Sequence, residues 1–269
     1  MPNAFVFLAA LLYATCAFLP LSQRRLVSAG AVAGWLLHAT ALWSEALPPG
    51  GLRLGFATVL SATLLISVAA WWFENRNMTL DGLRVLVLPC AAVAVTLPLI
   101  FPGSVVPLAG KSVLFSWHIA IAMLAYATLT IAAFHAVLMA LQESRLHHRG
   151  APRPGGWFDA AIERLPALLT MEKLLFRLIG FGFALLTLTV LSGIVFSEQL
   201  FGTPFKVDHK TIFTMLSWLL FGVLLAGRHW RGWRGKTALT FTLAGFATLL
   251  LAYVGSRFVL EVVLHRGVA

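Results

Sequence analysis

Three histidines could ligate a metal ion from one predicted face of this chain: His118, His209 and His265. Each lies at the edge of a long apolar run, and the alternation of apolar runs places all three edges on the same side. Imidazole nitrogens are common ligands of haem iron. Cations suit the haem propionates, and four basic residues lie nearby: Lys206, Lys210, Arg257 and Arg266. Two of the three histidines could therefore ligate the iron of a b-type, non-covalent haem, and the alternative is that chance and a preference for the lipid headgroup region placed them there.

The segment 197–210, SEQLFGTPFKVDHK, carries much of this chemistry. It ends in Asp208, His209 and Lys210, at the mouth of the next predicted helix. Phe201 and Phe205 could pack on a porphyrin ring. We therefore expect an outward-facing loop whose polar end approaches His118, with the loop also contributing Lys206.

Two further histidines and one arginine have structural alternatives. His38 lies in the middle of an apolar run, where a hydrogen bond to a neighbouring helix and a ligand or transit role are both open. His135 follows His118 by 17 residues, about 25 Å along a helix, so the two cannot ligate one iron. Arg257 and Glu261 lie four residues apart, so a local ion pair is the alternative to a propionate contact for Arg257.

The elements that must position these residues are membrane helices. Of the 269 residues, 59% are hydrophobic and 11% are charged, whereas soluble domains contain about 25% charged residues. A helical span needs about 20 mostly apolar residues. Eight runs qualify: 4–21, 27–43, 54–73, 83–101, 113–141, 174–196, 211–226 and 236–264. Because a helix satisfies its own backbone groups in lipid, we expect an all-α polytopic bundle forming a single domain over 1–269.

The basic residues predict the orientation of this bundle. Fourteen of the 20 Lys and Arg fall on one side of the predicted spans, and the positive-inside rule makes that side cytoplasmic. Both termini then lie outside, on the periplasmic side of a bacterial inner membrane. The net charge of +10 is explained by these loops and by anionic lipid, so no nucleic-acid partner is expected. The long cytoplasmic connection is 142–173, in which 157–169 could form an interfacial helix.

Spans five to eight resemble the cytochrome c assembly protein superfamily, whose CcsA and CcmC types handle haem in membranes. The resemblance rests on HIAIAMLAYATLTIAAFHAVLMALQ, LLFRLIGFGFALLTLTVLSGIVF and the stretch beginning DHKTIFTMLSWLLFGVLLAGRHWRGWRGK. Within the superfamily the chain is similar to the smaller YpjD- and HemX-like members. The region 111–269 carries the likeness, and 1–110 matches in its four spans and in the helix with His38.

The resemblance implies haem held near the outer face between two histidines, over a tryptophan-rich loop. By position, His118 matches the first outer histidine, Asp208 matches the aspartate of that loop, and His265 lies near the place of the second histidine. His209 competes with His265 as the second axial ligand. This chain departs from the family in the loop itself, where Phe201 and Phe205 replace the tryptophans.

We therefore predict a non-enzymatic haem-binding or haem-handling inner-membrane protein linked to cytochrome c maturation. The iron would be ligated by His118 and His209, stably or transiently, and other maturation proteins or haem-biosynthesis proteins would be its partners. One alternative is a HemX-like regulator of haem biosynthesis that contacts a protein partner through 142–173. Another is a transporter accessory subunit, which the scarcity of charged residues within the spans disfavours.

Overall fold

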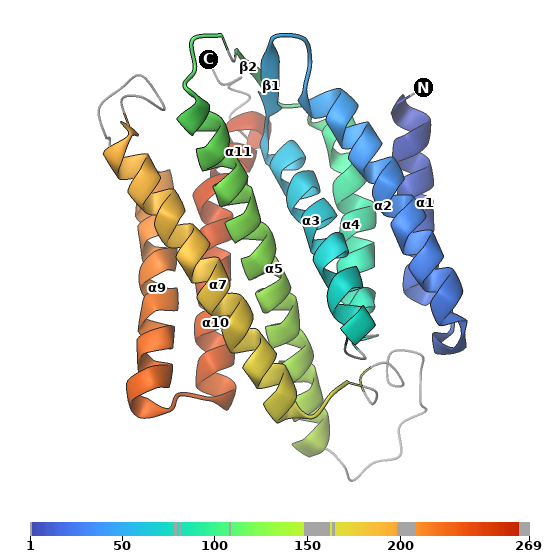
Figure 1. The fold of residues 1–269 in the computed structure, drawn as a ribbon, viewed down its shortest axis with the longest axis vertical. Helices are drawn as coiled ribbons and strands as arrows, with labels where there is room; N and C mark the ends of the chain where they lie inside the picture. The colour runs from blue at the N-terminus through green and yellow to red at the C-terminus, as the bar shows by residue number, and fades with distance from the viewer. Residues whose placement is uncertain are drawn as a thin grey trace.

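The structure, a computed structural model, describes residues 2–77, 80, 82–107, 109–147, 162, 165–197 and 208–263. Its long helices run side by side along one direction (Figure 1). They are α1 (Pro2–Phe18), α2 (Arg24–Ala46), α3 (Phe56–Asn77), α4 (Arg84–Ile100), α5 (Val113–His147), α7 (Leu168–Val195), α9 (His209–Arg231) and α10 (Gly235–Leu250). A 3-10 turn, η1 (Leu21–Gln23), precedes α2. All eight apolar runs of the sequence thus contain a helix, as a hydrocarbon environment requires.

Six of these helices are long and apolar enough to cross a membrane, judged by length and composition in the described residues. They are α2, α3, α5, α7, α9 and the helix that begins with α10. The other two, α1 and α4, are apolar but have 17 residues each. The chain is thus a polytopic helical membrane protein, while eight crossings and the outward placement of both termini remain predictions. The start of α1 and the end of the last helix lie at the same end of the bundle (Figure 1).

A small antiparallel sheet corrects the all-α prediction. Strand β1 (Gly51–Leu54) pairs with β2 (Ser104–Pro107), with Gly51 opposite Pro107 and Leu54 opposite Ser104. Gly103 turns into β2 with φ of +72°, and a Cβ there would approach the Leu54 carbonyl oxygen to 2.7 Å. Only glycine accepts that combination without strain. The two strands lie at one end of the helices, which is called the sheet end below (Figure 1).

The packing divides the helices into two groups joined by α3 and α5. In the N-terminal group α1 packs on α2 and α4, and α3 packs on α4. In the C-terminal group α5 packs on α7 and α10, and α9 packs on α7 and α10. Buried apolar side chains from both groups form one continuous core. The cavity described below belongs to the C-terminal group.

The end of the bundle opposite the sheet is fixed by an ion-pair network. Glu172 of α7 is buried and accepts from Arg228 Nη1 at 2.7 Å and from Arg234 Nε at 3.2 Å. The Trp233 ring packs so closely on Gly227 that a Cβ at Gly227 would overlap with it. These contacts hold the α9–α10 turn against α7.

Three predicted boundaries are wrong. Asp208 is the N-cap of α9, so His209 and Lys210 belong to the first turn of a helix and not to the loop predicted over 197–210. Helix α5 continues through His147 and α7 begins at Leu168, which shortens the predicted connection 142–173. Of the predicted helix 157–169, residues 157–161, 163 and 164 lie outside the described residues, 165–167 are not helical, and 168–169 belong to α7. The last run is α-helical only to Leu250 and continues as π-helix η2 (Leu251–Gly255), α11 (Ser256–Phe258) and π-helix η3 (Val259–Val263).

Candidate functional site

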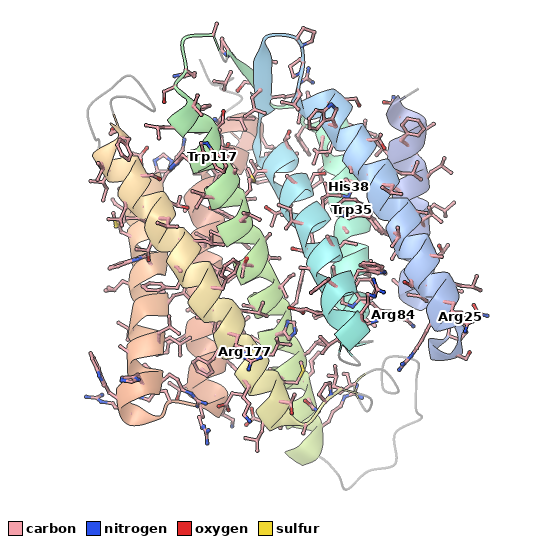
Figure 2. The ribbon with its side chains drawn as sticks, in the orientation of Figure 1. Arg25, Trp35, His38, Arg84, Trp117 and Arg177 are labelled. Carbon is pink, nitrogen blue, oxygen red and sulfur yellow. The ribbon has the colours of Figure 1, made fainter. Side chains whose placement is uncertain are left out.

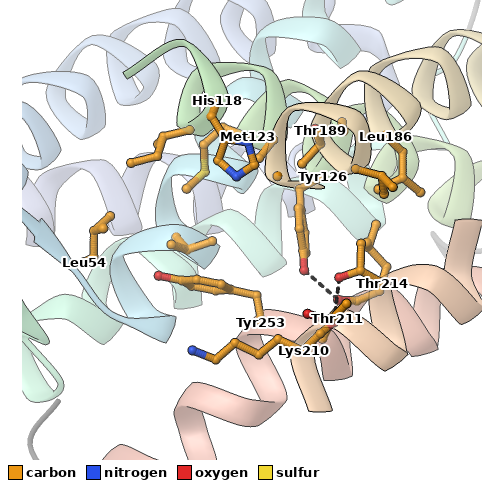
Figure 3. Close-up of a pocket in the computed structure, with 18 of the residues that line it drawn as sticks. Leu54, His118, Met123, Tyr126, Leu186, Thr189, Lys210, Thr211, Thr214 and Tyr253 are labelled. Carbon is orange, nitrogen blue, oxygen red and sulfur yellow. Dashed lines mark hydrogen bonds between the residues drawn. The ribbon is translucent and has the colours of Figure 1, made fainter. Parts of the chain in front are cut away.

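A cavity of about 580 Å³ opens at the sheet end between α5, α7, α9 and the π-helical end of the last helix (Figure 3). Apolar side chains form most of its wall, among them Ile119, Met123, Leu186 and Val190. Leu54 of β1 also lines it, so the sheet closes one side. The volume lies within the roughly 300–1,000 Å³ of small-molecule and cofactor sites.

His118 reaches this cavity from the first turns of α5, and its ring is fixed by α7. Its Nδ1 lies 2.8 Å from Ser192 Oγ, and the Ser192 hydroxyl lies 3.0 Å from the Thr189 carbonyl oxygen. A hydroxyl has one proton, and the carbonyl can only accept, so Ser192 donates to Thr189 and accepts from His118. Neutral His118 then carries its proton on Nδ1, which leaves the lone pair needed for metal ligation on Nε2. Orientation by a hydrogen bond on the second nitrogen is typical of metal-ligating histidines.

Cations face the same cavity from two other elements. Lys210 lines it from the first turn of α9, and Arg257 lines it from α11 with only 7% of its surface exposed. The Arg257 guanidinium lies 5.7 Å from the centre of the Tyr253 ring, and Lys210 extends beside the same tyrosine (Figure 3). Lys111 lines the cavity as well, with its Nζ 5.5 Å from the Phe115 ring. Three cations around one apolar cavity favour an amphipathic anion as its occupant.

Asp208 is the acid of the cavity wall, but it is engaged by its own helix. Its Oδ1 accepts from the Thr211 backbone N–H at 2.8 Å and from the Thr211 hydroxyl at 2.9 Å. Partial burial raises the pKa of Asp208, but these hydrogen bonds and the charges of Lys210 and His209 outweigh it, so that the pKa lies below its usual value. Asp208 is therefore an ionised helix cap, and the cations still outnumber it.

Tyr126 ties α5 to the end of α10 within the cavity wall. Its hydroxyl donates to the Leu249 carbonyl oxygen at 2.7 Å (Figure 3). That carbonyl lies two residues before η2, where the backbone changes from α-helical to π-helical pairing. The π-helical turn carries Tyr253 into the cavity. Short π-helical segments occur frequently at functional sites.

The structure brings together four of the predicted site residues and separates two others. His118, Asp208, Lys210 and Arg257 line the same cavity, whereas His209 is exposed and its side chain is not in the wall. His209 precedes Lys210 by one helical residue, about 100° around α9, so the two side chains point in different directions. The remaining predicted residues lie outside the described part of the chain: Phe201, Phe205, Lys206 and His265.

His38 is buried in the N-terminal group, with 0% of its surface exposed. Its Nε2 lies 2.8 Å from Ser61 Oγ of α3, and its Nδ1 lies 3.4 Å from the Tyr13 hydroxyl of α1. Both ring nitrogens therefore contact internal partners, which favours the structural alternative for this residue (Figure 2).

Four residues of the site were not predicted from the sequence: Lys111, Ser192, Tyr253 and the sheet residue Leu54. Ser192 lies in the stretch LLFRLIGFGFALLTLTVLSGIVF, where its hydroxyl was given no role. A small polar residue on a helix facing an intramembrane histidine was the available signal. Nothing in the sequence indicated the π-helical turn that positions Tyr253.

Comparisons with known proteins give one family. A sequence model of the family described as cytochrome C assembly protein matches residues 4–264. The inner membrane protein YpjD of Escherichia coli strain K12 is 30% identical over 243 residues, which cover 89% of this chain and 88% of the relative.

Proteins of another name match over shorter stretches. The cytochrome c biogenesis protein CcsA of Chlamydomonas reinhardtii is 30% identical over 144 residues, 54% of this chain and 38% of the relative. The CcsA of Prochlorococcus marinus is 30% identical over 172 residues, 58% of this chain and 54% of the relative. No solved structure gives a significant match.

Proposed function

Because this chain belongs to the cytochrome c assembly protein family, we propose that it binds haem non-covalently in the cavity beside His118 and handles it for cytochrome c maturation. The observation that carries the proposal is the meeting of one oriented imidazole, three cations and an apolar wall in one cavity. The N-terminal group would support this cavity and would contact the haem through few side chains, such as Val59 of α3.

The residues present fit a haem. Apolar side chains such as Ile119 and Met123 would bury the porphyrin faces, and His118 Nε2 would ligate the iron. Lys210 and Arg257 would meet the propionates, because carboxylates form strong charge-assisted hydrogen bonds with such cations. When bound, the haem is the cargo, and its iron supplies the redox and ligation chemistry of the cytochrome that receives it.

The protein's own residues would bind, orient and release this cargo, so we propose a carrier or scaffold and not an enzyme. The second axial ligand would be His209 or His265. His209 would need a different side-chain direction from the one in the structure, where it is exposed, and His265 would approach from the segment after η3. A site with one well-held ligand and one adjustable ligand suits transfer to a partner protein.

We propose the bacterial inner membrane as the location, with the sheet end on the outer side. The E. coli relative is an inner membrane protein by name. Six helices in the described part of this chain are long and apolar enough to cross a membrane. Partners in cytochrome c maturation would then meet the cavity from the outer side, where apocytochromes receive haem.

The proposal is tested by purifying the full chain in detergent from haem-sufficient cells and recording its absorption and pyridine haemochrome spectra. Wild type should show a Soret band from haem that acid acetone extracts. The variant His118→Ala should lose more than about 90% of it, since one of at most two iron ligands is removed.

The matched control is His229→Ala, which changes an exposed histidine at the opposite end of the bundle. His209→Ala and His265→Ala, compared with each other, identify the second ligand. A haem-free wild type, or equal haem in His118→Ala and His229→Ala, refutes the proposal.

The regulator alternative makes a different prediction. It assigns the function to 142–173, of which 148–161 lies outside the described residues. Shortening 148–161 would then change haem biosynthesis in cells while His118→Ala would not. The present proposal predicts the reverse: a maturation defect with His118→Ala and little effect of the shortened loop.

A further inference from the structure

A second hollow, of about 230 Å³, lies between α2 and α3 in the half of the bundle away from the sheet. Val32, Trp35 and Leu36 of α2 face Val68, Ala69 and Trp72 of α3 across it. Every lining side chain that the structure describes is apolar. The volume is smaller than the roughly 300–1,000 Å³ of cofactor sites, so a stretch of hydrocarbon chain is a better occupant than a second haem.

The two tryptophans of this hollow turn their polar atoms into the protein. Trp35 Nε1 donates to the Leu65 carbonyl oxygen at 2.9 Å, and Trp72 Nε1 donates to Ser28 Oγ at 2.8 Å. With both indole N–H groups satisfied, the rings present carbon to the hollow. The two indole rings therefore offer no hydrogen-bond donor to a polar headgroup within the hollow.

Arginines lie at the end of the hollow that is farther from the sheet. The Arg76 guanidinium lies 4.9 Å from the centre of the Trp72 ring. Trp72 bonds Ser28, and Arg24 precedes Ser28 by one helical turn, with Arg25 next to it. The start of α2 and the end of α3 are thus brought together by the Trp72–Ser28 hydrogen bond. Figure 2 shows Arg25 at this end and Trp35 higher on the same helix.

The acid on this part of α3 does not neutralise the arginines. Glu74 lies two residues before Arg76, on a different face of α3, and turns toward α5. Its Oε2 lies 3.7 Å from Nε2 of the fully buried His135. Among the described residues, this end of the hollow therefore gathers arginine side chains, while the Glu74 carboxylate faces α5.

We propose that this hollow is a binding site for one anionic phospholipid. An acyl chain would fill the space between Trp35 and Trp72, and the phosphate would meet Arg76, Arg24 and Arg25. Basic pockets between transmembrane helices bind anionic headgroups, and each arginine contributes about 1 kcal/mol near the surface. This site uses none of the haem residues, so it stands whether or not the cavity beside His118 binds haem.

The test is native mass spectrometry of the detergent-purified full chain, titrated with phosphatidylglycerol or with phosphatidylcholine of the same acyl chains. Wild type should bind one phosphatidylglycerol more tightly than phosphatidylcholine. Arg76→Gln should weaken phosphatidylglycerol binding about five-fold, which corresponds to about 1 kcal/mol, and leave phosphatidylcholine unchanged. The matched control is Arg231→Gln, which removes an exposed charge at the end of α9.

A second pair of variants tests the acyl chain. Ala69→Leu fills the hollow and should weaken binding of both lipids, whereas Ala33→Leu adds the same atoms to an exposed position of α2. If Arg76→Gln and Arg231→Gln bind phosphatidylglycerol with the same affinity, the lipid belongs to a non-specific shell and the proposal is overturned. If Ala69→Leu and Ala33→Leu bind the two lipids with the same affinity, the acyl chain does not occupy the hollow. Because Arg76 is exposed, its variant decides the headgroup contact even if Ala69→Leu does not fold.

Discussion

His38 and His118 are both histidines within membrane helices, yet the structure gives them opposite surroundings. His38 has no exposed surface and contacts Ser61 and Tyr13 through its two ring nitrogens. His118 has one nitrogen held by Ser192 and lies in the wall of a 580 Å³ cavity with cations around it. The first arrangement closes a contact between three helices, and the second presents an oriented ring to an occupant.

The difference shows what turns an intramembrane histidine into a candidate ligand. His38 is fully buried and His118 is half-buried, so burial by itself does not mark the candidate ligand. The separating features are space on one side of the ring, a fixed tautomer, and charge complementary to a ligand. A polar residue in a membrane span therefore predicts function only together with the packing around it.

The largest effect expected from this comparison is on stability, from His38→Ala. The variant leaves a cavity and strands the Ser61 and Tyr13 hydroxyls in the interior, which should cost about 3 kcal/mol. Thermal unfolding in detergent measures it, with His229→Ala as the control at an exposed site.

The haem content per folded His38→Ala protein should stay at the wild-type level. A loss of the Soret band without a loss of stability would break the comparison, because His38 would then belong to the haem site.

The next effect is on haem affinity, from Ser192→Ala. Removing the acceptor of the His118 Nδ1 proton frees the ring to rotate and to change tautomer. Loss of such an orienting partner typically lowers metal affinity about 10- to 100-fold. Haem titration of the apoprotein, followed at the Soret band, gives the Kd.

Ser192 acts through His118, so Ser192→Thr, which keeps a hydroxyl, should restore most of the affinity and the band position. The control Thr96→Ala removes a hydroxyl that is bonded to its own helix at Val93 and is exposed. If Ser192→Ala and Thr96→Ala bind haem alike, the ring is oriented by something other than this hydrogen bond.

The helices were predictable because lipid leaves few alternatives: each long apolar run must satisfy its own backbone and becomes a helix. The sheet was not predictable, since GLRL and SVVP have four residues each and are too short for their residue pattern to indicate a strand. These segments pair because α2, α3, α4 and α5 bring their connecting loops to the same end. That arrangement is tertiary and has no local signal.

The site followed the same division. His118, Asp208, Lys210 and Arg257 were expected near one another because each lies at the same predicted edge of its apolar run, and all four line one cavity. The direction of each side chain was not, because a one-residue change in helix phase rotates it by about 100°. His209 illustrates this: it was favoured as the second ligand, but the cap at Asp208 fixes a helical phase that turns Lys210 inward and leaves His209 exposed.

The smallest effect concerns that cap. Asp208→Ala removes the acceptor for the Thr211 N–H and should destabilise the protein by about 1 kcal/mol at neutral pH. Because the pKa of Asp208 is lowered in the folded protein, its charge stabilises the fold above the unfolded-state pKa. That stabilisation is lost as the pH falls through the folded-state pKa. Thermal unfolding from neutral to acidic pH should therefore show the gap between wild type and Asp208→Ala narrowing in acid.

Asp208→Asn is the informative partner, since its amide oxygen can still accept from Thr211 but cannot titrate. Asp208→Asn should keep most of the wild-type stability at neutral pH. Its stability relative to Asp208→Ala should not decrease in acid. The same series also tests the helix phase, because a weakened cap frees the first turn of α9. If haem is bound, Asp208→Ala should then alter the contribution of His209 more than that of His118. If the stability difference between wild type and Asp208→Ala instead increases in acid, Asp208 does not stabilise the fold as an ionised N-cap.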